Sequence, residues 1–433
     1  MLPLNALHAS LQRRVPPPLR TRYRRLRRWA QHKARVRQIP LERVLLGGEH
    51  VGEGGEHVGE HVYSAGQWAD LVGDPRRASL PLYESPHVQL LQRYSRDGPA
   101  ILDLAALRAT SYYRNALDCI RYSGHYFGQS TEAGIQAQAA AFCQLYERMR
   151  RGDPTEVSFP SPYGHSVRGT LPRVCATWTP NTYQVLDGYH RLAIAWVLGQ
   201  RHASVVVAGE QPTELQRLAL RVSVTQSRRE LYQPVSALDF DTSWPLVRRC
   251  EDRWAMMVAF LDRMGLDLSR SSMIDLACSY GWFVAEFARR GAQALGVEAE
   301  ADALRIGRIA YGLSPAQQVH GHIQWFLECT KMRCDIVLLL SVLHHLVLRP
   351  SRYSPEALLR QVDALTGSVL FLDTGQAHEQ WYRTALRGWD EHYIAQFIKQ
   401  HTTFSEVIPL GTDNDDRGYY AKNYRRTLFA CVR

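Results

Sequence analysis

Two segments of this 433-residue chain predict an α/β protein built from two domains. Residues 273–298 (MIDLACSYGWFVAEFARRGAQALGVE) contain a short apolar run, a turn of small residues, an amphipathic stretch and a second apolar run. Residues 183–199 (YQVLDGYHRLAIAWVLG) again place an apolar run before a turn and a helix-forming stretch. Both patterns are typical of a strand that leads through a tight turn into a helix. We therefore predict an open sheet in the C-terminal half and an α+β domain before it.

Charge and composition divide the chain into three predicted parts. A prior of about 150 residues per domain suggests two or three domains. We place a basic leader at residues 1–45, an α+β domain at 46–235 and an α/β domain at 236–433. Every charged residue before Glu42 is basic, which concentrates part of the net charge of +10 in the leader. An anionic membrane would attract each basic residue by about 1 kcal/mol, and nucleic acid is a competing binding surface. A third possibility is that the leader is a solvated arm that binds no partner.

Composition also argues against several classes of protein. No window approaches the ~20 apolar residues of a membrane span, and no apolar signal-peptide core follows the initiator. The eight cysteines form no CxxC pair, which predicts a reducing cytoplasm and neither a disulfide framework nor a zinc knuckle. His50, His57 and His61 lie in a near repeat of GEHVGE, where we expect a glycine-rich surface loop and no metal site.

The segment 273–298 predicts a nucleotide-cofactor site. Small residues between Ser279 and Gly281 allow the backbone to approach a ligand closely. Glu298 ends the apolar run 294–297, which we expect to be the next strand. In nucleotide-binding βαβ units an acid about 20 residues after the glycine turn hydrogen-bonds a pair of ribose hydroxyls. The position of Glu298 matches that spacing.

The segment 183–199 predicts an anion site at a helix start. We expect a strand at 183–186, a helix at 191–198 and a returning strand at 202–208, with Asp187 and Gly188 in the turn. Backbone amides at the start of this helix, together with His190 and Arg191, suit a phosphate. The alternative is that Asp187 caps the helix while His190 and Arg191 pair with neighbouring carboxylates.

The sequence DGYHR at this turn resembles the DGHHR signature of the ParB and sulfiredoxin-like superfamily. The resemblance implies that Asp187, Gly188, His190 and Arg191 contact the phosphates of a nucleotide. The superfamily includes CTPases, an ATP-using reductase and a kinase of free serine, so a kinase that uses ATP or another nucleotide with Mg²⁺ is conceivable here. The reductase activity is not expected, because the reactive cysteine of sulfiredoxin has no match in this turn.

Residues 239–433 resemble class I S-adenosylmethionine-dependent methyltransferases. The order of elements matches: a strand and turn at 273–281, a strand at 294–297, a third strand near 318–320, and strands at 334–346 and 368–375. FSEVIPLG and RTLFACVR follow, and we expect them to form a terminal antiparallel hairpin. The resemblance implies a Rossmann-like seven-stranded methyltransferase sheet and S-adenosylmethionine as the cofactor. The cofactor-binding residues that it implies are Asp275, Ala277, Ser279, Tyr280, Gly281, Glu298, His322 and Ser341.

The first turn departs from the DxGxGxG pattern of this family. Ala277 and Ser279 stand where the pattern has glycine, and they are suitable only if neither position needs a positive φ. The acid that often follows the third strand is replaced by residues 321–324, where His322 or Gln324 could substitute by hydrogen bonding.

Several side chains beyond the fourth and fifth strands are candidates for proton transfer from an acceptor hydroxyl or amine. The catalytic candidates are His344, His345, Asp373, His378 and Glu379. Adjacent helical residues point about 100° apart, so at most one of the paired histidines should face the pocket. A buried structural histidine is the alternative for each. A phosphate acceptor is already ionised and would need no base.

The loop 412–424 (TDNDDRGYYAKNY) carries the candidate acceptor contacts. It should open on the same sheet edge as the cofactor, which makes Asp413, Arg417, Tyr419 and Tyr420 candidate contacts; a solvated excursion is the alternative. Tyrosines and charges together suit a sugar better than an apolar metabolite.

We therefore expect a two-domain cytoplasmic enzyme that methylates a sugar or sugar phosphate of a bacterial surface polysaccharide. By analogy with bifunctional kinase-methyltransferases that cap O-antigen chains, the N-terminal domain could phosphorylate the acceptor. The expected partner is a glycan or lipid-linked oligosaccharide, with the leader holding the enzyme peripherally at the inner membrane. Two alternatives stay open: a nucleic-acid methyltransferase that uses the basic arm, and a nucleotide-sensing module without transfer activity.

Overall fold

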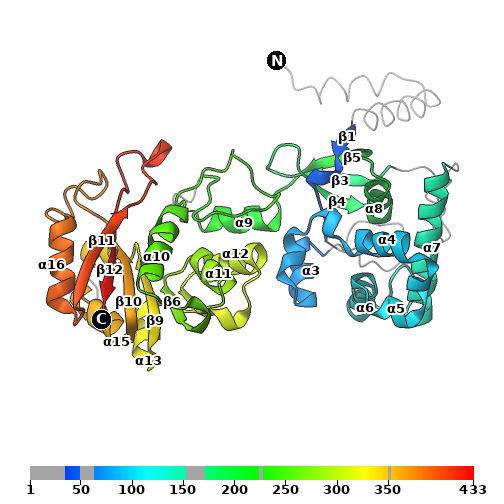
Figure 1. The fold of residues 1–433 in the computed structure, drawn as a ribbon. Coiled ribbons are helices and arrows are strands. Elements are labelled where there is room, and N and C mark those ends of the chain that lie inside the picture. The colour runs from blue at the N-terminus through cyan, green and yellow to red at the C-terminus, as the bar shows by residue number, and fades with distance from the viewer. Residues whose placement is uncertain (1–34, 49–62, 153–170, 224–227, 350–352) are drawn as a thin grey trace, which may run out of the picture. The chain divides into compact units, whose positions relative to one another are not determined.

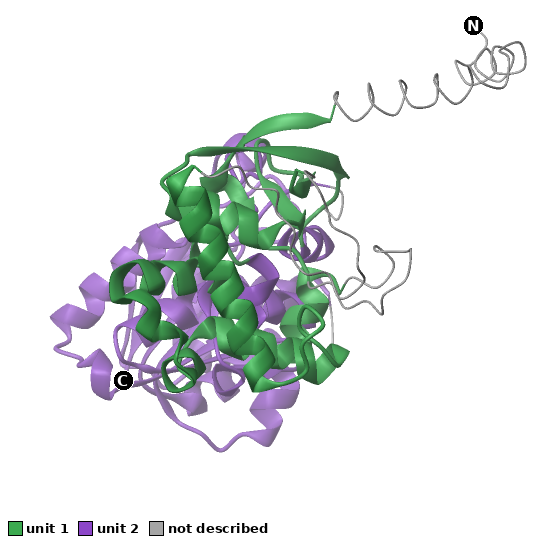
Figure 2. Ribbon diagram, turned by 90° about the vertical axis from the view of Figure 1, so that its right-hand side faces the viewer, with its two compact units in different colours: residues 1–73, 80–213 green, residues 74–79, 214–433 purple. Residues whose placement is uncertain are grey.

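The structure, a computed structural model, describes residues 35–48, 63–152, 171–223, 228–349 and 353–433. The chain folds into two compact units (Figures 1 and 2). Unit 1 comprises residues 1–73 and 80–213, and unit 2 comprises residues 74–79 and 214–433. The division thus falls after Thr213, whereas the sequence suggests position 235. Most of the basic leader and the three histidines of the GEHVGE repeat lie outside the described residues.

Unit 1 contains a five-stranded mixed sheet in the order β1-β5-β3-β4-β2. Its strands are β1 (Val36–Pro40), β2 (Val44–Leu45), β3 (Arg173–Ala176), β4 (Tyr183–Asp187) and β5 (His202–Glu210). Its helices are α3 (Ala65–Val72), α4 (Pro86–Asp97), α5 (Leu104–Arg108), α6 (Ser111–Ser123), α7 (Glu132–Arg151) and α8 (Tyr189–Val197). The predicted strand, helix and strand around the DGYHR turn are confirmed as β4, α8 and β5.

Unit 2 contains a seven-stranded sheet in the order β11-β12-β10-β9-β6-β7-β8. Its strands are β6 (Ser272–Leu276), β7 (Gln293–Glu298), β8 (Gln318–His320), β9 (Cys334–Leu340), β10 (Thr366–Asp373), β11 (Glu406–Thr412) and β12 (Thr427–Val432). Strands β8, β7, β6, β9 and β10 pair in parallel, and β12 runs antiparallel to both of its neighbours. The predicted α/β class, the seven strands and the terminal hairpin are therefore confirmed.

Helices cover both faces of this sheet. The helices of unit 2 are α9 (Glu214–Arg221), α10 (Glu251–Arg263), α11 (Trp282–Arg289), α12 (Ala301–Tyr311), α13 (Ile323–Cys329), α14 (Leu343–Leu348), α15 (Pro355–Leu365) and α16 (Glu391–His401). Within the described residues, no helix has the length and apolar character that a membrane crossing requires.

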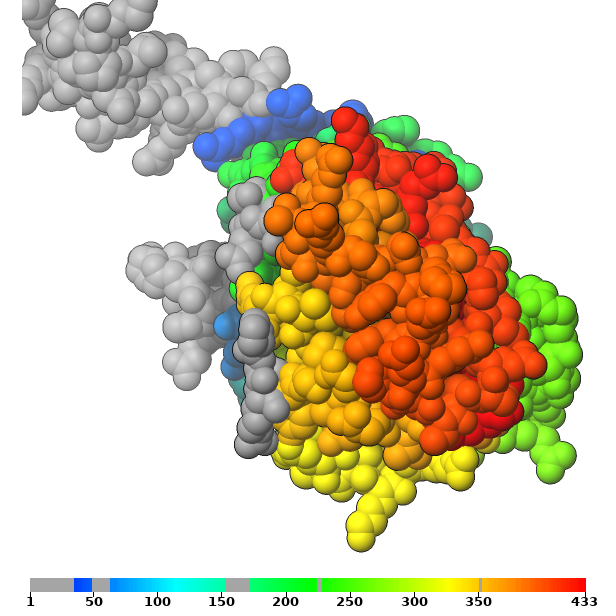
Figure 3. Space-filling view, turned by 90° about the vertical axis from the view of Figure 1, so that its left-hand side faces the viewer, coloured from blue at the N-terminus to red at the C-terminus, as the bar shows by residue number. Residues whose placement is uncertain are grey.

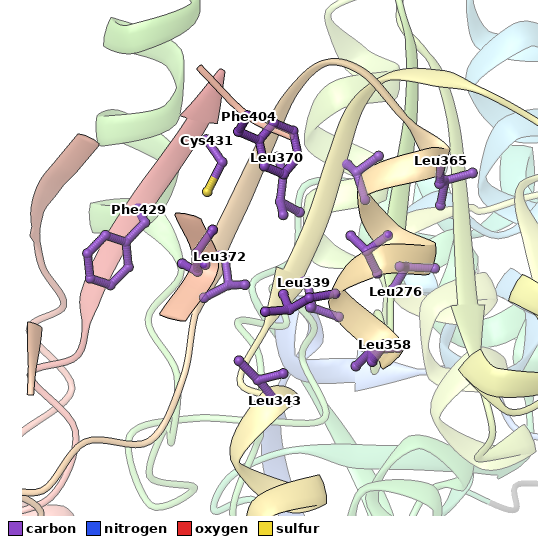
Figure 4. Packing of buried hydrophobic residues seen from close by; sticks show 14 of the residues in the cluster. Leu276, Leu339, Leu343, Leu358, Leu365, Leu370, Leu372, Phe404, Phe429 and Cys431 are labelled. Carbon is purple, nitrogen blue, oxygen red and sulfur yellow. The ribbon is translucent and has the colours of Figure 1, made fainter. Parts of the chain in front are cut away.

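Alternation along the strands produces two hydrophobic layers. Ile274 and Leu276 of β6 face α13, α15 and α16, and Figure 4 shows Leu358 and Leu365 of α15 packed on this layer. Met273, on the opposite face, packs with α10, α11 and α12. Because side chains of consecutive strand residues point to opposite faces, the apolar central strands are buried on both sides. The C-terminal part of unit 2, coloured orange to red, makes up much of the face that Figure 3 presents. The carboxyl ends of the five parallel strands lie along the same edge of the sheet, where the strands end. This edge carries the candidate site.

Candidate methyl-donor and acceptor site

The turn between β6 and α11 has an unusual backbone. Ala277 and Ser279 have φ values of 67° and 53°, and Gly281 has a φ of 83°. The left-handed region costs a residue with a side chain about 1–2 kcal/mol, because its Cβ approaches the following carbonyl oxygen. The condition under which alanine and serine suit these positions, that neither needs a positive φ, is therefore not met. The turn keeps the conformation of a glycine turn without two of the glycines.

Glu298 lies beside this turn, at the carboxyl end of β7. One oxygen of its carboxylate accepts a hydrogen bond from the backbone amide of Ser279 at 2.8 Å, and the other accepts from the amide of Glu300 at 2.9 Å. Each carboxylate oxygen has a second lone pair with which it can accept a further hydrogen bond. Glu298 is half-buried, so the carboxylate combines a fixed position with access for a ligand. The turn and Glu298 therefore fit the ribose of a nucleoside-type methyl donor.

Two other residues of the turn segment lie deeper. Asp275 is buried, and this burial, with the negative charges of Glu298 and Asp373, raises its pKa to about 8. The side chain of Tyr280 is fully buried, and its hydroxyl accepts a hydrogen bond from the backbone amide of Tyr232 at 3.2 Å. The side chain of Tyr280 therefore stabilises the fold around the turn by its burial and by this hydrogen bond.

A segment before the sheet, residues 228–234, runs along the turn; we call it the strap. The amide of Gln233 donates to the carbonyl oxygen of Cys278 at 3.2 Å and accepts from the backbone amide of Trp282 at 3.2 Å. Tyr311 of α12 donates to the carbonyl oxygen of Pro234 at 2.7 Å. From the sequence this region reads only as a connection between domains, and no spacing or periodicity marks Gln233 as part of the site.

Ser341 and Asp373 join the ends of β9 and β10. The amide and the hydroxyl of Ser341 both donate to Oδ1 of Asp373, at 2.7 and 2.9 Å. Burial raises the pKa of Asp373, but the charges of Arg248 and Arg253 outweigh it, so that the net pKa is below the ordinary value. Asp373 is therefore ionised, and its carboxylate oxygens already accept hydrogen bonds from Ser341 and form an ion pair with Arg248.

Asp373 belongs to a buried ion cluster of two arginines and three aspartates. Arg248 lies 3.1 Å from Asp373, 3.5 Å from Asp413 and 3.3 Å from Asp415. Arg253 contacts the same three carboxylates at 3.6, 3.3 and 3.0 Å. All five side chains are at most 4% exposed. The cluster ties the start of α10 and the end of β10 to the loop between β11 and β12.

Glu379 forms a second buried pair. Arg426 donates two hydrogen bonds to its carboxylate at 2.8 and 2.9 Å, and the backbone amides of Gln376 and Tyr424 donate at 2.8 and 3.1 Å. The structure thus places Glu379 in a bidentate ion pair that holds the loop in place.

The three candidate histidines have different surroundings. His344 is buried, and its Nδ1 accepts a hydrogen bond from the backbone amide of Gly375 at 3.1 Å. Burial and the nearby positive charges of Arg426 lower the pKa of His344 far below its ordinary value, so the ring is neutral with its proton on Nε2. His345 and His378 are exposed, and Nε2 of His378 lies 2.6 Å from the carbonyl oxygen of Tyr424. Of the adjacent pair only His344 is buried, and the expectation that at most one of the two faces the pocket stays a prediction.

The loop between β11 and β12 presents exposed and buried side chains side by side. Tyr420 is buried, and its hydroxyl donates to Glu230 of the strap at 2.6 Å. Tyr419 is 58% exposed and lies under the guanidinium of Arg228, 3.7 Å from the ring centroid. Arg417 is exposed. These contacts bring the predicted acceptor residues and the strap together.

Trp381, which the sequence does not single out, stands beside this loop. It is 45% exposed, and its ring lies 5.7 Å from Tyr420 and 5.9 Å from Tyr424. At the other end of the sheet His322 is exposed at the start of α13, just beyond β8. Because β8 pairs with β7 so that His320 is opposite Glu298, His322 lies near the donor side of the edge.

The DGYHR turn of unit 1 is described by itself. Gly188 has a φ of 95° and begins α8 without a side-chain cap. Arg191 lies 3.6 Å from Asp187. The ring of His190 is 5% exposed and packs 4.3 Å from Phe142. His190 therefore packs in the core of unit 1. Arg191 pairs with a neighbouring carboxylate, as the second alternative expects, but Gly188 and not Asp187 is the N-cap of the helix.

Comparison with known proteins gives a family for part of the chain. A family model described as a methyltransferase domain matches residues 274–365. No curated protein sequence matches the chain. The bifunctional kinase-methyltransferase WbdD is similar in structure, with a TM-score of 0.40 and 19% identity over 50% of this chain and 46% of that protein. The chain thus spans slightly less than half the length of that protein.

Two further solved structures are similar to part of this chain. Magnesium protoporphyrin IX methyltransferase from Synechocystis PCC 6803, with bound S-adenosylmethionine, has a TM-score of 0.31 and 17% identity over 42% of this chain and 79% of that protein. A SAM-dependent methyltransferase from Archaeoglobus fulgidus has a TM-score of 0.31 and 12% identity over 41% of this chain and 94% of that protein. The family match covers strands β6 to β9 of the seven-stranded sheet, and the C-terminal part of this chain is therefore a class I S-adenosylmethionine-dependent methyltransferase domain.

Proposed function

We propose that this chain methylates a phosphate oxygen of a sugar phosphate in a bacterial surface polysaccharide. S-adenosylmethionine supplies an already activated methyl group, so the protein must hold the donor, align an acceptor oxygen and exclude water. Glu298 and the turn at 277–281 would hold the donor, and the ends of β9 and β10 lie beside them at the same sheet edge. Ser341 and His344 face this edge and would orient the acceptor.

The state of the candidate bases is the observation that carries the choice of acceptor. The depressed pKa of His344 keeps its ring neutral, and because Nδ1 accepts a hydrogen bond from a backbone amide, the single ring proton is on Nε2. Asp373 and Glu379 are engaged by arginines. A sugar hydroxyl needs a base that removes its proton, whereas a phosphate oxygen is ionised at neutral pH. The Nε2–H of His344 can donate to such an anion, and none of these three buried groups is poised to deprotonate an alcohol.

Exposed side chains of the loop and of the strap, together with Trp381, also favour a sugar phosphate as the acceptor. Arg228 and Arg417 supply positive charge, while Tyr419 and Trp381 supply aromatic faces. Guanidinium groups bind phosphate through paired N–H donors, and flat aromatic rings suit the apolar face of a pyranose. This pairing favours an acidic glycan over an apolar metabolite.

The acceptor is tested with matched oligosaccharides that differ only in one phosphate monoester. We expect S-adenosylhomocysteine release and a methyl phosphate ester, by mass spectrometry, with the phosphorylated acceptor alone. His344→Asn keeps an acceptor for the Gly375 amide but loses the Nε2–H donor and cannot act as a base, so it should raise the KM for the acceptor and retain kcat. Turnover with the unphosphorylated acceptor that His344→Asn abolishes would contradict the proposal and restore a base mechanism.

Unit 1 would supply that phosphate, as an ATP- and Mg²⁺-dependent kinase. The support is its DGYHR turn, where the start of α8 at Gly188 and the guanidinium of Arg191 suit nucleotide phosphates. Asp187→Ala with Arg191→Ala should abolish ATP-dependent phosphorylation of a glycan, while Arg201→Ala, beyond the end of α8, serves as the matched control. Phosphorylation that survives the double substitution removes the kinase part of the proposal.

The acceptor would be lipid-linked and reached at the inner membrane through the basic leader. Co-sedimentation with vesicles that contain anionic lipid should decrease when residues 1–34 are deleted, and more steeply at low salt than at high salt. Competition by duplex DNA at equal phosphate concentration would instead favour nucleic acid as the surface that the leader binds.

A further inference from the structure

The donor turn holds a conformation that its own residues disfavour. Ala277 and Ser279 adopt φ values of 67° and 53°, and Cys278 lies between them. Residues with a Cβ rarely occupy this region, and a structure keeps them there only where surrounding contacts over-determine the backbone. The contacts that do so are therefore part of the donor site.

Strand β7 fixes the amide groups of the turn. The amides of Ala277 and Cys278 both donate to the carbonyl oxygen of Val297, at 2.9 and 3.0 Å, and the amide of Ser279 donates to Glu298. These bonds hold the turn against the sheet. The carbonyl oxygen of Cys278, which lies between the two strained residues, accepts a hydrogen bond from the amide of Gly281 at 2.9 Å within the turn and a second one from a side chain of the strap.

Gln233 of the strap supplies the second hydrogen bond to that carbonyl group. Its Nε2 donates to the oxygen of Cys278, and its Oε1 accepts from the amide of Trp282, the first residue of α11. The side chain is 5% exposed. A single amide group therefore bridges the turn from its strained middle to the helix that follows it. A carboxamide donates from its nitrogen and accepts at its oxygen, whereas a carboxylate only accepts and an ammonium only donates.

We infer that Gln233 is a positioning residue that holds the donor turn in the left-handed conformation which glycine would otherwise supply. The inference rests on the assignment of this turn to the methyl donor. It predicts that the need for Gln233 disappears when the strain is removed. Glycine at positions 277 and 279 should therefore compensate for the loss of Gln233.

The test is a cycle of three variants: Gln233→Met, the pair Ala277→Gly with Ser279→Gly, and all three substitutions together. Methionine keeps the length and volume of the side chain and loses both hydrogen bonds. Gln216→Met is the matched control, because Gln216 is a buried glutamine of the same unit that donates to the carbonyl oxygen of Asp239 at 2.6 Å, away from the turn. S-adenosylhomocysteine affinity by calorimetry and the melting temperature are measured for each variant.

We expect Gln233→Met to weaken S-adenosylhomocysteine binding about tenfold, which corresponds to about 1.4 kcal/mol. The triple variant should recover to within about twofold of the native affinity, because coupled residues are not additive. Gln216→Met should lower the melting temperature without a change in affinity.

Native affinity in Gln233→Met overturns the inference, and so does a weakened Gln233→Met that the glycine pair leaves unrescued. A native chain that does not bind S-adenosylhomocysteine overturns the donor assignment instead. In that case the melting temperatures still test whether Gln233 holds the turn. If it does, the glycine pair should restore the stability lost in Gln233→Met.

Discussion

The backbone amide of Ser279 and the carboxylate of Glu298 are 2.8 Å apart, so the residue predicted to bind the donor ribose also holds the turn that approaches it. Ser279 is one of the two turn residues with a side chain and a positive φ. A carboxylate that accepts backbone hydrogen bonds is fixed in orientation before a ligand arrives. Donor recognition and the geometry of the turn therefore depend on one side chain.

Glu298→Gln is expected to weaken S-adenosylhomocysteine binding about ten- to hundredfold, because a hydrogen bond to a charged group contributes about 1.5–3 kcal/mol. The amide keeps the volume of the side chain but replaces one acceptor oxygen by an NH₂ group. Isothermal titration calorimetry measures the change. Glu300→Gln is the control, since Glu300 is exposed and contributes only its backbone amide to Glu298. Equal affinities of the two variants would remove Glu298 from the donor site.

Glu379→Ala should destabilise unit 2 by about 3–5 kcal/mol, because it leaves the Arg426 guanidinium buried without its partner. Glu379→Leu combined with Arg426→Met should recover much of that loss, since apolar side chains of similar volume often replace a buried ion pair at little cost. Denaturant unfolding measures both. If Glu379→Ala were as stable as the native chain but inactive, Glu379 would act in the chemistry and not in holding the loop.

The stability of unit 2 should fall as the pH drops below about 6.5. The folded pKa of His344 lies far below its ordinary value, so the unfolded chain binds a proton that the folded chain does not. The contribution is complete above the unfolded pKa and is lost at up to about 1.4 kcal/mol per pH unit below it. His344→Asn cannot titrate, and its unfolding free energy should show a smaller slope between pH 6.5 and 5. Identical slopes would place the His344 ring in a solvated position.

Asp275 gives the opposite dependence. Its pKa of about 8 in the folded chain exceeds its ordinary value of 3.8, so the folded state binds the additional proton. Stability should decline from about pH 4 to about pH 8 and then level off, with a maximum slope of about 1.4 kcal/mol per pH unit. Asp275→Asn lacks this proton, and its stability relative to the native chain should increase over that range in urea unfolding. A constant difference would mean that Asp275 is ionised throughout.

Local patterns in the sequence predict the sheet and the donor side of the site. Apolar runs mark the parallel strands because both of their faces are buried, and the spacing from the turn to Glu298 is set within one βαβ unit. The ion cluster could not be predicted in this way. Arg248 and Asp373 are 125 positions apart, and Arg253 and Asp415 are 162 apart, so only the folded chain brings the charges together.

Positions inside short motifs were also ambiguous from sequence. Helical spacing shows that His190 and Arg191 point in different directions, but it does not say which of them meets the core. The structure places His190 among aromatic rings, and burial lowers its pKa well below the ordinary value. Alanine and serine rarely adopt a positive φ, so the residue types alone do not predict the backbone at positions 277 and 279. Both residues have a positive φ in the structure, where long-range contacts from Gln233 and Glu298 hold the turn.

Gly307→Ala should weaken the donor site from the side of α12. A Cβ at Gly307 would lie 2.1 Å from the carbonyl oxygen of Tyr280, a backbone atom that cannot rotate away. Either the helix or the turn must therefore move, and such overpacking costs about 1–3 kcal/mol. We expect a lower melting temperature together with weaker S-adenosylhomocysteine binding, because the displaced group belongs to the turn itself. Gly209→Ala, where a Cβ meets nothing within 4 Å, is the control and should change neither. A Gly307→Ala variant that loses stability and keeps native affinity would show that α12 moves while the turn stays in place, and that the turn is then held by the sheet and the strap alone.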